Sequence, residues 1–190
     1  MKDNKDAKRV DGISMSIATR LKQVRSEHNL SLDKAAALTG VSKAMLGQIE
    51  RQESSPTIAT LWKIATGLKV SFSSFLTNNV PSESIIQQGF IHDPNMQVST
   101  LFPYSSDKGF EVFEITLSQF HEQHSSAHQT GVTEHLHVLE GKLGVLEGNQ
   151  WIQIEVGKQF VLAADQAHGY KDMSGKTRFI SIIHYPMVSL

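Results

Sequence analysis

The chain has no cysteine among its 190 residues. This absence excludes a disulfide framework and every metal site that depends on thiolate ligands. The sequence also lacks an apolar run long enough to span a membrane, and no secretory signal peptide opens it. We therefore expect a cytoplasmic protein that has no membrane partner.

A strong net charge is missing too, because the formal total is −1. Residues 1–79 nevertheless carry 12 Lys and Arg against 7 Asp and Glu, whereas the remainder carries 6 against 12. Eight of the nine histidines lie in that acidic remainder. A chain of this length suits two small domains. We expect a basic domain that meets phosphates and an acidic domain with a separate task.

Residues 31–56 contain two helix starts separated by a turn. Ser31 and Ser42 are suited to cap helices, because a serine hydroxyl accepts from the free backbone N–H groups of a first turn. Gly40 supplies the positive φ that ends the first helix. The residues expected on its apolar face are Leu32, Ala35, Ala36 and Leu38. Two short helices joined this way form a helix-turn-helix, which sets its second helix into the DNA major groove.

This run resembles the lambda-repressor-like, or XRE-type, helix-turn-helix family. The residues that carry the resemblance are Ala36, Gly40, Val41, Ser42, Leu46, Ile49, Glu50 and Pro56. The resemblance covers roughly residues 16–76 and implies an all-α bundle of five helices over residues 16–77. Two short helices considered alone leave a second interpretation open, namely a helical hairpin that binds nothing.

The flanking sequence sets the expected limits of this domain. Residues 1–15 are polar and mixed in charge, so a disordered arm is expected there. Apolar spacing predicts a first helix around Ile17, a fourth helix that Thr57 caps and Gly67 closes, and a short fifth helix over residues 72–76.

The helix-turn-helix predicts which side chains meet DNA. The residues expected to meet base edges lie on the outer face of the second helix and are Lys43, Ala44, Gly47 and Gln48. The residues expected to meet phosphates are Ser31 and Thr57 at helix starts and Arg51 just past the second helix. Ser42 caps the second helix, so the first turn of that helix is expected to reach base edges.

The second half of the chain has a different pattern. Residues 78–94 are polar, contain Pro81 and are expected to form a linker. After them, short β-rich runs alternate with glycine and polar turns. The predicted strands are residues 97–101, 110–117, 136–139, 143–146, 151–154, 160–162 and 178–184. Many short strands at such spacing predict an all-β sandwich or small barrel.

Two spacings within this region resemble the cupin family, whose fold is a double-stranded β-helix or jelly-roll barrel. Glu134 follows His128 by six residues and precedes Gly141 by seven, and Gly157 precedes His168 by eleven. The resemblance covers about residues 95–186 and implies an effector-binding domain over residues 95–190. The first cupin motif has two histidines separated by one residue, and in this chain Thr130 stands where the second is usual.

The cupin resemblance implies that His128, Glu134 and His168 converge on one site. Imidazole and carboxylate ligands suit a divalent zinc, iron or manganese ion. Thr130 and Tyr170 are further candidates for contact with an effector. A pocket that binds an organic effector without metal is the alternative. The cupin topology is expected to place the strand of His168 beside the segment that carries the other two ligands.

The other histidines and the apolar residues of this region are expected to have structural roles. If Glu134 points inward, strand alternation sends His135 and His137 outward. His121 and His124 precede the motif in a polar loop and are expected to be solvated. The apolar residues expected to fill the barrel core include Phe113, Ile115, Phe160 and Ile182.

A helix-turn-helix joined to a cupin resembles a bacterial transcription-factor architecture. The resemblance implies a non-enzymatic regulator that senses a small metabolite, such as an amino acid or a related compound. It also implies a homodimer through the cupin that binds an operator with two-fold symmetry. Two rival functions stay open: a metal-dependent cupin enzyme, and a DNA binder whose barrel is vestigial.

Overall fold

The computed structural model describes the backbone of residues 3–76 and 94–186, and the side chains from Ser14 onward. The chain divides into two compact units, Met1–Asn79 and Val80–Leu190, which we describe separately. Within the described residues, no helix is long and apolar enough to cross a membrane.

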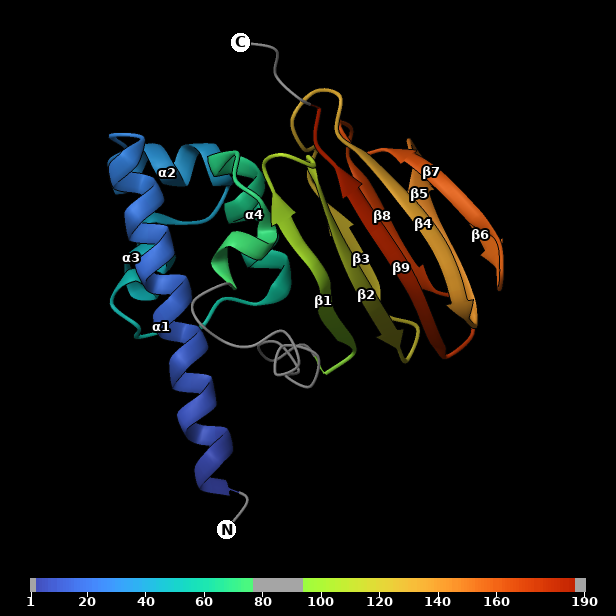
Figure 1. Ribbon diagram of the computed structural model, residues 1–190, viewed down its shortest axis with the longest axis horizontal. Helices are drawn as coiled ribbons and strands as arrows, with labels where there is room; N and C mark the ends of the chain where they lie inside the picture. The colour runs from blue at the N-terminus through green and yellow to red at the C-terminus, as the bar shows by residue number, and fades with distance from the viewer. Residues whose placement is uncertain (1–2, 77–93, 187–190) are drawn as a thin grey trace. The chain divides into compact units, whose positions relative to one another are not determined.

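The first unit is helical (Figure 1). Its elements are α1 (Asp3–Glu27), α2 (Leu32–Thr39), α3 (Lys43–Glu50), α4 (Ile58–Leu68) and the 3₁₀ helix η1 (Phe72–Phe75). The expected fifth helix is therefore a single 3₁₀ turn. Helix α1 begins at Asp3, where a disordered arm was predicted. Residues 3–15 contain no proline, so a helical backbone is compatible with this polar sequence.

Side-chain caps start three of the helices, as predicted. The hydroxyls of Ser31, Ser42 and Thr57 accept from backbone N–H groups three residues ahead, at 3.2, 3.2 and 3.1 Å. Gly40 ends α2 with φ of 66°. Leu38 departs from the prediction, because 55% of it is exposed while Ala35 is buried.

Gly67 has a different role from the predicted one. It lies inside α4, which ends at Leu68, and Lys69 takes the left-handed conformation after it. A Cβ atom on Gly67 would lie 2.5 Å from the carbonyl oxygen of Leu38 and 2.6 Å from the Cα of Thr39. The glycine therefore lets α4 approach the backbone of α2 closely, and it does not close the helix.

A partly buried ion pair connects α1 to α3. Arg25 donates to both carboxylate oxygens of Glu50, at 2.7 and 2.9 Å, and to the carbonyl oxygen of Leu30 at 3.0 Å. Bidentate pairs of this kind add geometric specificity as well as energy. The pair fixes the orientation of α3 within the bundle.

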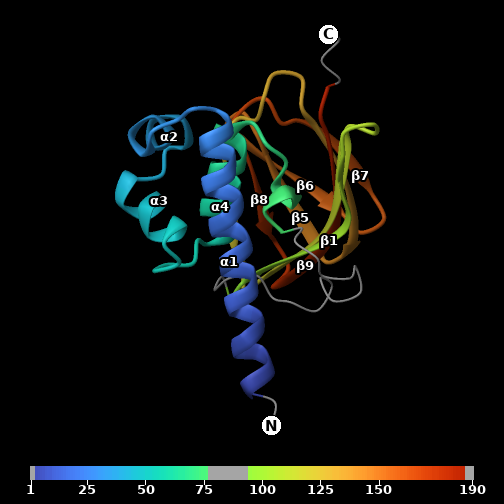
Figure 2. The same ribbon diagram turned by 60° about the vertical axis from the view of Figure 1, so that its left-hand side comes forward.

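The second unit is all-β and contains nine described strands. They are β1 (Met96–Ser105), β2 (Phe110–Ser118), β3 (Glu122–Ser125), β4 (Thr133–Glu140), β5 (Lys142–Glu147), β6 (Gln150–Glu155), β7 (Gln159–Ala163), β8 (His168–Asp172) and β9 (Lys176–His184). A five-stranded sheet has the order β1-β2-β9-β4-β7, and a four-stranded sheet has the order β3-β8-β5-β6. The two sheets form two layers (Figure 2). All seven strands predicted from the sequence pattern are present. That pattern did not predict β3 or β8, although the cupin resemblance implied a strand at His168.

Alternation along the strands decides which side chains face the interior. On β4, Glu134 is buried while His135 and His137 are exposed, as predicted. Phe113 is fully buried, which confirms its assignment to the core. Ile182 does not belong to the core, because it is 36% exposed and its neighbours on β9 point inward instead.

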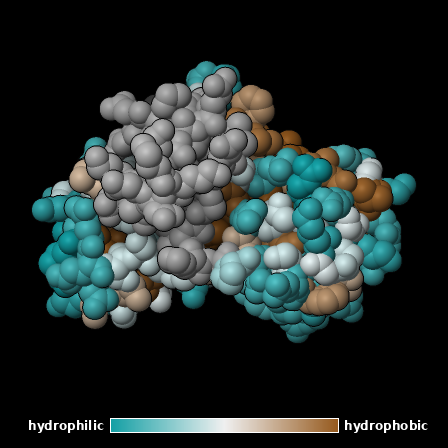
Figure 3. Space-filling view, turned by 90° about the horizontal axis from the view of Figure 1, so that it is seen from below, coloured by the Kyte–Doolittle hydropathy of each residue, from teal (hydrophilic) through white to brown (hydrophobic). Residues whose placement is uncertain are grey.

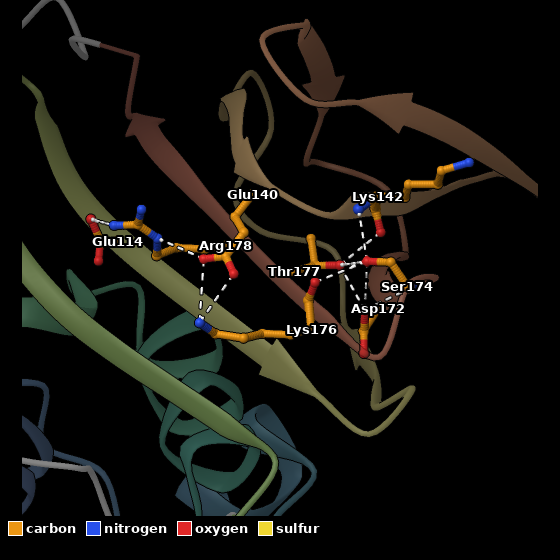
Figure 4. A network of polar contacts seen from close by, with 8 residues as sticks. All are labelled: Glu114, Glu140, Lys142, Asp172, Ser174, Lys176, Thr177 and Arg178. Carbon is orange, nitrogen blue, oxygen red and sulfur yellow. Dashed lines mark hydrogen bonds and ion pairs between the residues drawn. The ribbon is translucent and has the colours of Figure 1, made fainter.

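A buried carboxylate closes the turn between β8 and β9 (Figure 4). Asp172 accepts from the backbone N–H groups of Phe120 and Ser174, at 2.9 and 3.0 Å, and from the Thr177 hydroxyl at 2.7 Å. Burial raises the pKa of Asp172, but these hydrogen bonds outweigh it and hold the pKa below the usual value. The ionised carboxylate therefore ties three segments together.

Replacement of Asp172 by Asn should lower the free energy of unfolding by about 2 kcal/mol at pH 7, because charge-assisted hydrogen bonds are lost in a buried position. A group with a lowered folded-state pKa stabilises above its unfolded pKa of about 3.9 and ceases to do so as pH falls further. The difference between wild type and variant should therefore shrink below about pH 4. Denaturant unfolding at several pH values measures this, with Glu147→Gln at an exposed position as the control. An equal difference at pH 3 and pH 7 would contradict the assignment.

The visible surface of both units is largely hydrophilic, with smaller hydrophobic areas (Figure 3). In the second unit, the strand register aligns one row of residues across the five-stranded sheet: Phe102, Val112, Ile182, His135 and Val161. Phe102 and Val161 are 61% and 55% exposed, whereas Val112 is buried. We call these residues the apolar row, in which His135 is the one polar member.

Candidate functional site

Helix α3 presents an exposed polar face. Lys43, Ala44 and Gln48 are exposed, as expected of residues that read bases. Gly47 is buried, and a Cβ atom there would lie 3.1 Å from Nη1 of Arg51. The exposed side chain of Arg51 therefore lies beside Gly47, where the predicted close approach of DNA to the backbone would take place.

Two cations flank this helix. Lys43 lies in its first turn, and its Nζ is 2.8 Å from a carboxylate oxygen of Asp33 on α2. Arg51 follows the helix, and its Nη2 is 2.7 Å from Glu53. The exposed caps Ser31, Ser42 and Thr57 begin α2, α3 and α4. The unit therefore offers cations and helix N-termini, which are the groups that contact phosphates.

A second candidate site lies between the two sheets of the second unit. His128 precedes β4, Glu134 lies on β4 and His168 begins β8. One potential ligand atom from each lies within 4.8 Å of the other two. The predicted convergence is present. However, β8 belongs to the four-stranded sheet and does not lie beside β4, whose neighbours are β7 and β9. The cluster therefore forms between the two sheets.

The three side chains meet at one oxygen of Glu134. Its Oε1 is 3.1 Å from Nε2 of His128 and 3.4 Å from Nε2 of His168. The hydroxyl of Ser181 donates to the other oxygen at 3.3 Å. Nδ1 of His168 lies 2.8 Å from the carbonyl oxygen of Gln166 and donates to it, because a carbonyl only accepts. This bond leaves Nε2 of His168 directed toward the carboxylate.

The electrostatics favour a charged carboxylate facing a cation. Burial raises the pKa of Glu134, but hydrogen bonds with His128 and His168 outweigh it and lower the pKa to about 2. Burial lowers the pKa of His168, and the hydrogen bond with Glu134 outweighs it, so the pKa of this imidazole is raised. The cluster thus favours a positive charge beside the carboxylate, either a proton on His168 or a metal ion.

The residues present fit a divalent metal. Two imidazoles and one carboxylate are suitable ligands for zinc, iron or manganese. Metal-bound histidines usually donate their other ring N–H to a carbonyl or carboxylate, and His168 does so to Gln166. Burial of all three side chains, at 7% exposure or less, also separates the cluster from bulk water.

Of the other predicted contacts, the structure brings Tyr170 near the cluster and leaves Thr130 outside. The ring of Tyr170 lies 6.0 Å from that of His168, and its buried hydroxyl has no hydrogen-bond partner among the described residues. Thr130 is exposed in a turn. His124 is also exposed and pairs with Glu122 at 2.6 Å, away from the cluster.

Sequence reasoning missed a second buried carboxylate. Glu111 on β2 is fully buried and accepts from the hydroxyl of Tyr185 at 2.5 Å. Glu111 and Glu134 both pair with Ile183 on β9, so both face the interior in one row of the sheet. Alternation with the core residue Phe113 placed Glu111 inward, and that signal was available in the sequence.

Comparisons with known proteins match the helical unit and also most of the chain. A helix-turn-helix family model, HTH_3, matches residues 21–75. The HTH-type transcriptional regulator SutR of Escherichia coli is 42% identical over 93% of this chain and 99% of its own length. The crystal structure of an HTH_3 family transcriptional regulator from Vibrio cholerae is 51% identical, covers 92% of this chain and 97% of its own, and has a TM-score of 0.85.

The barrel alone has a match among solved structures. A Cupin_2 domain of an XRE family transcriptional regulator from Enterobacter cloacae is 32% identical in sequence and has a TM-score of 0.47. The match covers 48% of this chain and 98% of that domain.

Proposed function

Because this chain belongs to the helix-turn-helix transcriptional regulators of the XRE family, we propose that it binds a specific DNA operator and that its cupin-like barrel senses a small metabolite. The proposed sensing function is supported mainly by the buried cluster of His128, Glu134 and His168. Helix-turn-helix binding does not require these three groups, and such groups are costly to bury without a partner. An amino acid or a related compound is the favoured effector, and the protein acts in the cytoplasm.

On the DNA side, α3 enters the major groove. Lys43 donates to the acceptors of guanine, Gln48 pairs with adenine, and Ala44 contacts a thymine methyl group. The capped starts of α2, α3 and α4 (Ser31, Ser42 and Thr57) and the side chain of Arg51 contact phosphates, which fix the position of the unit on the duplex.

Replacement of Arg51 by Ala should weaken binding to all DNA sequences alike, because a phosphate contact carries no sequence information. The slope of log affinity against log salt should fall by about 0.9. Fluorescence anisotropy of labelled duplexes at several salt concentrations measures both quantities. A loss confined to one operator base pair would show that Arg51 reads a base.

In the barrel, His128, Glu134 and His168 hold a divalent metal. A bound ion supplies a Lewis-acidic centre with positions left for an effector carboxylate or amine. Tyr170 supports this assignment, because an unpaired buried hydroxyl costs about 1–3 kcal/mol and an effector can supply its partner. Without metal, the imidazoles and the carboxylate hold the charged ends of the effector directly.

The effector regulates the affinity for DNA by binding one state of the protein better than another. A two-fold operator requires two helix-turn-helix units, so the regulated quantity is the spacing or freedom of the two units in a dimer. The coupling is reciprocal, so operator DNA changes the affinity for the effector by the same factor.

The barrel is also the proposed dimer contact, and the exposed apolar row on the five-stranded sheet supports this. The full-length protein and residues 80–190 should sediment as dimers, and residues 1–79 as a monomer. Val161→Asp should weaken the dimer, because it places charge in the apolar row. Val156 is equally exposed, at 56%, but lies outside the row, so Val156→Asp is the matched control. A dimeric 1–79 fragment would move the interface to the helical unit.

One observation favours a second candidate, a metal-dependent enzyme. Two histidines and one carboxylate are also the ligand set of non-haem iron oxygenases. Oxygen uptake by the iron-loaded protein, with repeated turnover of an added metabolite, would support catalysis. Stoichiometric binding that changes affinity for the operator supports the sensor, and binding without any change in affinity supports a vestigial barrel.

A further inference from the structure

The helical unit pairs its acidic residues in an unusual way. Residues 14–76 contain eight basic and four acidic side chains, and all four acids lie in ion pairs. The pairs are Arg20–Glu27, Arg25–Glu50, Lys43–Asp33 and Arg51–Glu53. Two of them use the cations that flank the DNA-reading helix. A unit that attracts phosphates therefore holds two carboxylates beside its binding face.

The pair of Lys43 and Asp33 joins the first turns of α3 and α2. The Nζ atom lies 2.8 Å from Oδ2, and the two side chains are 58% and 70% exposed. An ion pair this exposed contributes little to the stability of a fold. The fold therefore gains little from Asp33, and its main physical effect falls on Lys43.

Asp33 affects the two kinds of DNA contact differently. A phosphate that approaches Lys43 must displace the carboxylate or lie beside it, and like charges at close range repel. A base acceptor carries no net charge. Because an ammonium group has three N–H donors, Lys43 can donate to a base while it keeps its bond to Asp33. The carboxylate thus opposes phosphate contacts and tolerates base contacts.

We propose that Asp33 is a positioning residue that holds Lys43 toward base edges and so determines specificity. This inference rests on the proposed entry of α3 into the major groove. In random DNA, where Lys43 finds no matching base, Asp33 keeps the ammonium group from gaining a phosphate contact. In operator DNA, the same bond orients the lysine for its base.

Glu53 provides the comparison within the same unit. It binds Arg51 through two hydrogen bonds, at 2.8 and 2.7 Å. Arg51 is assigned to a phosphate contact, and phosphate is present in every duplex. Loss of the Glu53 carboxylate should therefore strengthen binding to operator and random DNA by the same factor. Loss of the Asp33 carboxylate should strengthen binding to random DNA only.

The test uses the full-length protein with two duplexes: one of random sequence and one selected from a random library by the wild type. Asp33→Asn should raise affinity for the random duplex about two- to fivefold and steepen its salt dependence, with no gain on the selected duplex. The specificity ratio therefore falls. Asp33→Glu keeps a carboxylate within reach and should restore the ratio. Glu53→Gln should raise both affinities and leave the ratio unchanged.

Glu27→Gln is the control for net charge, because it removes the same charge as Asp33→Asn. Glu27 lies on α1, where it pairs with Arg20 at 3.8 Å. Equal strengthening of both duplexes by Asp33→Asn, or a change no larger than that of Glu27→Gln, would overturn the proposal. A wild type that selects no sequence from the library would overturn the proposed function itself.

Discussion

The metal affinity of the full-length protein should fall at least about 100-fold when Glu134 is replaced by Gln. Loss of a group that only hydrogen-bonds to a metal ligand lowers metal affinity about 10–100-fold, and loss of a ligand itself should cost more. Glu134 is the residue that both imidazoles of the cluster face. The amide removes the negative charge but keeps the shape of the side chain. Titration with Zn²⁺ followed by measurement of bound metal per chain gives the affinity.

The double variant Glu134→Ala with His168→Ala extends this prediction to regulation. It should lose the response to the effector and keep basal operator binding, because neither residue lies in the helical unit. Glu140→Gln is the matched control, since Glu140 lies at the exposed end of the same strand and pairs with Lys176 at 3.2 Å. Wild-type metal content and an unchanged effector response in the double variant would refute the site assignment.

Lys43→Ala and Gln48→Ala should each weaken operator binding by about 1–3 kcal/mol and relax the preference at one base pair. The two losses should be close to additive if the two side chains read different base pairs. Anisotropy titrations with single-base operator variants identify the position that each residue reads. Lys63→Ala is the control, because Lys63 is an exposed lysine on α4. If both variants bind operator and random DNA as the wild type does, α3 is not the reading helix.

The helix-turn-helix was predictable because its signals are local. Ser31, Gly40, Ser42 and Thr57 act on backbone groups within three or four residues, so their spacing alone locates three helix starts and one end. Gly67 shows the limit of such signals. A glycine can end a helix or admit a neighbouring backbone, and only the packing of α4 on α2 decides between them.

Burial of single apolar residues was less predictable. Leu38 and Ile182 were assigned to the core, yet both are exposed. In an eight-residue helix, the apolar face spans only two turns, so one residue at its edge can point either way. In β9, alternation places Ser181 and Ile183 inward and leaves Ile182 outside although it is apolar.

The barrel site required information that a single sequence does not contain. Strands β3 and β8 show no apolar strand pattern because their residues, such as Gln123, His124, His168 and Asp172, are mostly polar. Only the cupin resemblance implied a strand at His168. The pairing of β8 with β3 and β5 joins residues far apart in the chain, so the meeting of His168 with Glu134 across two sheets depends on topology. Resemblance identified the ligands, and the structure supplied their arrangement.

We propose that the cluster of His128, Glu134 and His168 controls the affinity of the helical unit for DNA. The most direct test measures operator affinity of freshly purified protein before and after dialysis against a chelator. The wild-type dissociation constant should change by about fivefold or more and should return when the released small molecules and metal are added back. The double variant at Glu134 and His168 should show neither change. A wild-type constant that is unaffected by removal and restoration would show that the cluster does not regulate DNA binding.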